Sequence, residues 1–227
     1  SGEGEMSVSD EVEHVECVRV AASSGHVHVV ARGDAFHVHG DADVRIDGRC
    51  ATVDVGSRRV TVHVPEGSDV VIGTSSGRID VEGAAGAVAA TSTSGRITIE
   101  RARSIDARTS SGRVEVGRCE GECRVASTSS RVTVDRCGGA DVSTSSGRIE
   151  LRDVDGLVRA HCVSGRIHIQ MDGAHDAEAE TVSGRVEISY PPDVQYRRAD
   201  DSDTDRPEAT CTVRAHSVSG RVAVGNR

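Results

Sequence analysis

Arginine recurs at one position of a short phrase throughout this chain. The phrase reads Ser-Gly-Arg, then an aliphatic, a polar and a second aliphatic residue, as in Ser76-Gly77-Arg78-Ile79-Asp80-Val81. The arginines at this position are Arg59, Arg78, Arg96, Arg113, Arg131, Arg148, Arg166, Arg185 and Arg221. Guanidinium groups bind phosphate and carboxylate through paired N–H donors. A regular row of them therefore predicts a groove for a linear polyanion.

Acidic residues support a second interpretation of the same row. Asp80, Glu115, Glu150 and Glu187 each stand two positions after one of these arginines. Such a column would neutralise the row and give a charge-balanced edge that discourages side-by-side aggregation. The net charge of -9 and the three aromatic residues of the chain disfavour nucleic acid as a ligand under either interpretation.

Histidine occurs in two His-x-His pairs, His26/His28 and His37/His39. Each pair alternates with apolar residues, so its imidazoles are expected on the outer face of a strand. In a hairpin both pairs would share one face and could hold a metal such as Zn²⁺. In a repeat solenoid they would lie on opposite sheets. No serine or cysteine stands in a nucleophile motif, so we expect no enzymatic activity and no cofactor.

The cysteines bear on the compartment of the protein. Cys119 and Cys137 lie 18 residues apart at equivalent turn positions, which predicts a disulfide in an oxidising compartment. The total of seven is odd and favours a reducing one. We therefore expect a cytoplasmic protein, with an exported or membrane-anchored ectodomain as the alternative. No apolar run approaches the ~18 residues of a membrane span.

A repeat of about 18 residues must position these side chains. Its glycine slot is occupied by Gly77, Gly95, Gly112, Ser130, Gly147, Gly165, Gly184 and Gly220. A second pair of alternating apolar residues begins seven positions before each slot, as at Val70/Ile72. Two short strands per repeat predict an all-β, flattened parallel β-solenoid of about eleven coils. An apolar share of 36% with so few aromatic rings fits its narrow core.

We expect one solenoid domain over residues 1–227, with a lead-in at 1–16 and a polar insertion at 190–209. The insertion is expected to shield the last coil. Residues 11–64 lack the Ser-Gly-Arg phrase, and antiparallel pairing is the rival arrangement there. Ala31-Arg32-Gly33-Asp34 would then be a hairpin turn.

The phrase T-S-S-G-R-I-D-V-E-G at Thr74–Gly83, and the entry Val64-Pro65-Glu66-Gly67 before it, resemble the bacterial toast-rack family of adhesin-like β-strand repeats. The resemblance implies a β-solenoid without catalytic residues, associated in some members with envelope-stress or membrane-linked assemblies. Many members carry Asp where this chain has Arg after the glycine.

The expected function is a non-enzymatic scaffold or binding module that works through its outer faces and its arginine row. Its expected partner is a protein or an envelope polyanion. End-to-end self-assembly as a structural protein is the first alternative. A metal-binding domain that uses the surface histidine pairs is the second.

Overall fold

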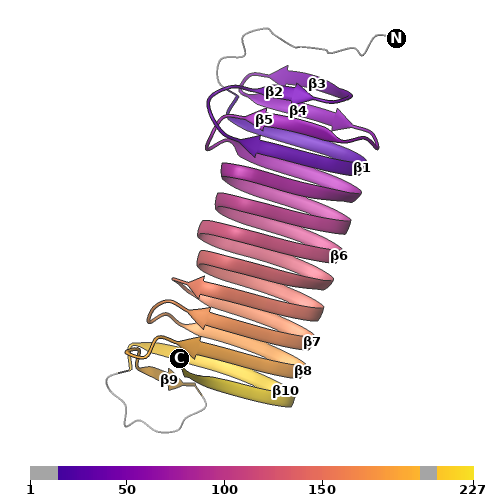
Figure 1. Ribbon diagram of the computed structural model, residues 1–227. Coiled ribbons are helices and arrows are strands. Elements are labelled where there is room, and N and C mark those ends of the chain that lie inside the picture. Colours follow the sequence, from indigo (N-terminus) through magenta and orange to yellow (C-terminus); the bar gives the residue numbers. More distant parts are fainter. Residues whose placement is uncertain (1–14, 200–208) are drawn as a thin grey trace. The chain divides into compact units, whose positions relative to one another are not determined.

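The computed structural model describes residues 15–199 and 209–227. Those residues form strands and turns, and none of them is helical. Within the described residues there is thus no helix that could span a membrane. The strands are β1 (Cys17–Ala31), β2 (His37–His39), β3 (Ala42–Asp47), β4 (Cys50–Val55), β5 (Val60–Val64), β6 (Asp69–Val154), β7 (Val158–Met171), β8 (Ala177–Tyr190), β9 (Tyr196–Arg198) and β10 (Cys211–Asn226) (Figure 1). The all-β, mostly parallel arrangement that the repeat predicts is confirmed.

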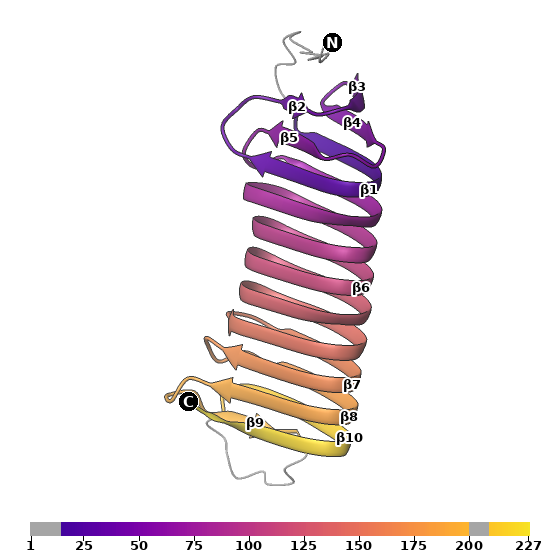
Figure 2. The same cartoon turned by 45° about the vertical axis from the view of Figure 1, so that its right-hand side comes forward.

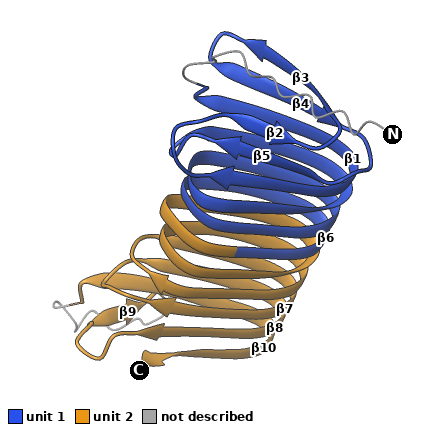
Figure 3. Cartoon of the chain, turned by 45° about the horizontal axis from the view of Figure 1, so that its top comes forward, with its two compact units in different colours: residues 1–115 blue, residues 116–227 orange. Residues whose placement is uncertain are grey.

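The chain divides into two compact units, residues 1–115 and residues 116–227, and β6 runs from the first into the second (Figure 3). That the whole chain is a single domain stays a prediction.

In unit 2, β7 pairs in parallel with both β6 and β8, and β8 pairs in parallel with β10. The register joins equivalent repeat positions, so Gly165 pairs with both Gly147 and Gly184. Gly220 pairs directly with Gly184 across a sequence step of 36 residues. The inserted residues therefore leave the repeat register unchanged, as the sequence predicts.

The core of each unit consists of the alternating aliphatic residues of the repeat. Ile79 and Ile97 in unit 1, and Ile149 and Ile167 in unit 2, are fully buried. Their polar neighbours face outward because successive side chains of a strand point to opposite faces. Tyr190 is an exception to the aromatic-free core that we expected, since its ring is fully buried at the end of β8.

The glycine of the phrase lets neighbouring coils approach at the corner. A Cβ on Gly165 would collide with the carbonyl oxygen of Gly147, and one on Gly184 with that of Gly165. Both glycines also have positive φ, at 155° and 153°. The absence of a side chain therefore sets the spacing of the backbone at this corner.

Unit 1 departs from the expected order of coils. β1 pairs in parallel with β6 on one side, where Gly25 aligns with Gly77. On its other side β1 pairs in parallel with β4 and β5. The coil formed by β4 and β5 therefore lies beyond β1 and not between β1 and β6, although it comes between them in sequence. The Ser24-Gly25 corner of β1 matches the repeat phrase, whereas the later coil has Ser57-Arg58-Arg59 there.

Antiparallel pairing in this region is limited to two short strands. β2 pairs with β5, and β3 pairs with β4. β1 and β2 do not pair, so the predicted hairpin at residues 31–34 is wrong. β1 instead uses both of its edges for the in-register parallel pairing of the repeat, which leaves no edge for β2.

The insertion covers part of β10. β9 pairs in parallel with β10, where Tyr196 aligns with Cys211, and the two strands lie side by side in Figures 1 and 2. The Tyr196 hydroxyl donates to the carbonyl oxygen of Val224 over 3.2 Å, and its ring stacks on that of Tyr190. The remainder of the insertion, at 200–208, and most of the lead-in, at 1–14, lie outside the described residues.

Candidate functional site

A groove of about 880 Å³ follows the Ser-Gly-Arg corner of unit 2. It is lined by Ser129, Ser130, Arg131, Gly147, Arg148, Gly165, Arg166, Gly184, Arg185, Gly220 and Arg221. The groove exists because the glycine slot puts no side chain at the corner, while the next residue of each coil is an arginine. Five of the nine arginines of the row that the sequence identifies thus lie in one groove.

The parallel register fixes the order of the cations. Arg166 aligns with Arg148 on one side and with Arg185 on the other, and Arg185 aligns with Arg221. Neighbouring strands lie about 4.8 Å apart. The five guanidinium groups are therefore attached to the backbone at regular intervals over roughly 19 Å.

These five guanidinium groups have no ion pair within 4 Å among the described residues. Only Arg148 and Arg185 have an acidic residue two positions later, and each of these two carboxylates lies against another side chain. Glu150 pairs instead with Arg152 at 2.6 Å, and the hydrogen bond from Arg152 holds the pKa of Glu150 below its usual value. Glu187 lies 3.5 Å from His168 of the neighbouring strand. The acidic side chains of unit 2 are thus directed to Arg152 and His168 and away from the groove arginines.

In unit 1, two arginines of the phrase are neutralised by the acidic residue that follows two positions later, as expected for a charge-balanced edge. Arg78 pairs with Asp80 at 3.0 Å, and Arg113 pairs with Glu115 at 3.3 Å. Arg96 is followed two positions later by a threonine and has no ion pair with a described residue. Ion pairs within the phrase are therefore present in unit 1 at Arg78 and Arg113, and the five arginines of the row in unit 2 have none among the described residues.

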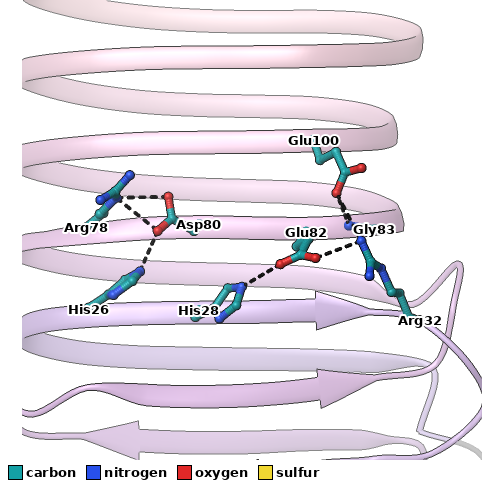
Figure 4. A network of polar contacts seen from close by, with 8 residues as sticks. All are labelled: His26, His28, Arg32, Arg78, Asp80, Glu82, Gly83 and Glu100. Carbon is teal, nitrogen blue, oxygen red and sulfur yellow. Dashed lines mark hydrogen bonds and ion pairs between the residues drawn. The ribbon is translucent and has the colours of Figure 1, made fainter.

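The first predicted histidine pair is occupied by carboxylates (Figure 4). His26 lies 2.5 Å from Asp80, and His28 lies 3.1 Å from Glu82, both across the β1–β6 ladder. Arg32 also reaches Glu82, at 2.7 Å. The imidazoles face outward, as expected, but each is part of a polar network.

The second pair, His37 and His39, lies on the same sheet as the first pair but is not adjacent to it. Neither of the two arrangements considered from sequence is therefore correct. The strand order is β2-β5-β1, so β5 separates His37 and His39 from the pair on β1. His63 of β5 stands opposite His37, and its ring centroid is 5.4 Å from that of His39. Sequence reasoning missed His63, although its place between Val62 and Val64 signals an outward side chain.

Burial, followed by the nearby imidazoles of His39, His37 and His28, lowers the pKa of His63. Within residues 15–199 and 209–227, however, no three histidine, cysteine or acidic side chains are arranged to hold a metal ion. Three of the four histidines predicted as ligands, His28, His37 and His39, thus lie near His63 without forming such a group.

The disulfide also differs from the predicted one. Cys17 of β1 is bonded to Cys50 of β4, with 4.7 Å between their Cα atoms, and the two align in the parallel ladder. Cys119 and Cys137 are buried thiols outside any disulfide, and the thiol of Cys119 donates to the carbonyl oxygen of Glu122. Burial raises the pKa of Cys137 to about 12, so this thiol is not a reactive thiolate.

Comparison with known proteins gives one match. A family model described as Toastrack DUF4097 matches residues 52–225, which include the whole arginine-lined groove. No curated protein and no solved structure matches the chain.

Proposed function

This chain belongs to the Toastrack DUF4097 family, and we propose that it is a non-enzymatic binding module whose groove in unit 2 holds a linear polyanion. One observation carries the proposal: five guanidinium groups line a single groove without a carboxylate partner among the described residues. Phosphate or carboxylate groups would supply the missing partners through charge-assisted hydrogen bonds. An unbranched chain of such groups matches a row of evenly spaced cations.

The proposed scaffold is a flattened parallel solenoid of 18-residue coils, with fewer coils than the eleven expected from sequence because β2 and β3 pair antiparallel. In-register pairing of equivalent repeat positions within each unit supports this proposal. A solenoid suits a linear ligand because each coil adds one equivalent binding position along the axis.

The net negative charge of the chain favours binding of a polyanion at the groove over binding elsewhere on the surface. The chain carries 36 acidic against 27 basic residues, so a polyanion is repelled by most of the molecule and attracted only where arginines are uncompensated. Each neutralised anionic group releases counterions. With five contacts, the logarithm of the binding constant should fall with the logarithm of salt concentration with a slope of roughly -3.5.

The proposed compartment is oxidising, so we favour the exported alternative over the cytoplasmic one. The Cys17–Cys50 disulfide supports this choice, because such bonds persist mainly outside the cytosol. An envelope polyanion is then the class of partner that the groove would meet.

A charge-matched pair of variants tests the groove. The test variant is Arg148→Gln/Arg166→Gln/Arg185→Gln. The control, Arg124→Gln/Arg159→Gln/Arg214→Gln, removes the same charge from arginines of unit 2 that pair with Glu122 or Glu178 outside the groove. Binding to poly-glutamate or polyphosphate is measured by titration calorimetry at several salt concentrations.

We expect the groove variant to lose more than about tenfold in affinity and the control less than about threefold. Equal losses would show that net charge alone drives binding. Absence of binding by the unmodified protein at low salt would refute the proposal. Light scattering on the same samples excludes end-to-end assembly as the source of any signal.

A further inference from the structure

Three exposed valines accompany the groove in the last three phrases of unit 2. Val163, Val182 and Val218 have exposed fractions of 44%, 46% and 72%. Each stands two residues before a groove glycine. The earlier phrases carry a hydroxyl residue at this position, namely Ser75, Thr93, Ser110, Thr128 and Ser145. The repeat thus tolerates a polar residue here, and core packing does not require valine.

The valines form a row parallel to the arginines. The pairs Cys162–Thr181 and Ser164–Ser183 flank Val163 and Val182 in the β7–β8 ladder. The pairs Thr181–Ser217 and Ser183–Ser219 place Val218 in the same row. Within each coil, only a serine and a glycine separate the valine from the arginine. An apolar row therefore lies next to the cationic row in these three coils, although the valines are not among the residues that line the groove.

Two parallel rows of this kind match a ligand with two chemically distinct sides. An extended peptide has such sides, because its successive side chains point in opposite directions. A segment in which acidic and apolar residues alternate can direct carboxylates to the guanidinium groups and apolar side chains to the valines. A phosphate polymer has no apolar side. A sugar polymer would favour an aromatic platform, and no aromatic residue lines the groove.

We propose that the groove of unit 2 binds an extended acidic peptide in which carboxylate and aliphatic side chains alternate. This inference rests on the proposed function and adds that the valine row selects among polyanions. Charge complementarity to the five arginines identifies the peptide as acidic, and the exposed valines identify its second face as aliphatic.

The experiment compares three ten-residue peptides: alternating Glu-Val, alternating Glu-Ser, and all-Glu. Their affinities for the full chain are measured by fluorescence anisotropy. The variant Val163→Ser/Val182→Ser/Val218→Ser introduces a residue that other phrases carry at this position, so its folding should be preserved. Val71→Ser/Leu157→Ser is the control, since both side chains are exposed outside the row.

We expect the Glu-Val peptide to bind at least about tenfold more tightly than the Glu-Ser peptide. The triple valine variant should lose this preference, and the control should keep it. Equal binding of the two alternating peptides, with no effect of the triple variant, would overturn the inference and leave the polyanion groove intact.

If no acidic peptide or polyphosphate binds, the proposed function itself fails. The last measurement compares binding of the protein to vesicles with and without anionic lipid. Binding to anionic vesicles that needs both rows, without peptide binding, would replace the peptide by a membrane surface and overturn the inference.

Discussion

At the scale of single residues, the arginine of the Ser-Gly-Arg phrase is ion-paired in some repeats and unpaired in others among the described residues. Arg78 and Arg113 fold back on the carboxylate two positions later. Arg148 has the same neighbour in sequence, but Glu150 is held by Arg152. A surface ion pair is worth little free energy, so such a choice between two cations depends on local geometry. That choice leaves Arg148 without an ion pair among the described residues and open to a ligand.

The corner glycines make a prediction about stability. Gly147 has φ of 133°, and a Cβ there would collide with the carbonyl oxygen of Ser130. Gly147→Ala should therefore lower the free energy of unfolding by about 1–3 kcal/mol, measured by urea denaturation. Gly225→Ala, with no atom within 4 Å of its added Cβ, should stay within about 0.5 kcal/mol. Equal effects would contradict a special role for the corner.

His63 makes a prediction about pH. Its pKa is lowered from the ordinary 6.5, so the folded chain binds fewer protons than the unfolded chain as the pH falls through that value. Stability contributed by neutral His63 is therefore lost on acidification, from about 6.5 downward. His63→Thr should show a smaller drop in melting temperature between about pH 7.5 and pH 5 than the unmodified protein. An unchanged drop would assign the acid sensitivity to other groups.

At the scale of elements, the short strand β9 determines what β10 exposes. The edge of a sheet offers unpaired N–H and C=O groups to other chains. β9 satisfies part of this edge at Cys211–Val213, and Tyr196 reaches the far end of β10 through its hydroxyl. The insertion thus acts as a partial cover, supported by the stacked rings of Tyr190 and Tyr196 at 5.3 Å.

Removal of the Tyr196 ring should weaken the pairing of β9 with β10. Tyr196→Ala eliminates both the stacking and the hydrogen bond to Val224. We expect amide hydrogen exchange in Cys211–Val213 to accelerate about tenfold, with peptides of β7 unchanged. Tyr196→Phe keeps the ring and should give an intermediate rate. Protection of β10 equal to that of the unmodified protein would show that β9 does not cover it.

At the scale of the whole molecule, the seven cysteines divide into two groups with different roles. Five are buried thiols, and two form the bond that closes a segment of 33 residues in unit 1. Chain-entropy arguments assign about 3–4 kcal/mol to a loop of this size. This bond ties β1 to β4, the strand that reverses the expected order of coils.

The number of free thiols can be measured directly. Under denaturing conditions without reductant, a thiol reagent should detect five groups, and seven after reduction. Reduction, or the variant Cys17→Ser/Cys50→Ser, should lower the free energy of unfolding by about 3 kcal/mol. Cys119→Ala should reduce the count to four without removing this dependence on redox state. Seven thiols before reduction would contradict the bond.

The sequence by itself determines the repeat, the strands and the parallel register, because apolar alternation and the Ser-Gly-Arg spacing are local properties that every coil repeats. It also identifies the arginine row, since a side chain that follows a fixed corner must stand in line with its equivalents. Only the tertiary structure places β1 between β5 and β6, joins Cys17 to Cys50, and brings His63 to His39. These contacts link segments without a shared phrase, so no spacing reports them. The partner of Glu150 is likewise decided in three dimensions, where two cations compete for one carboxylate.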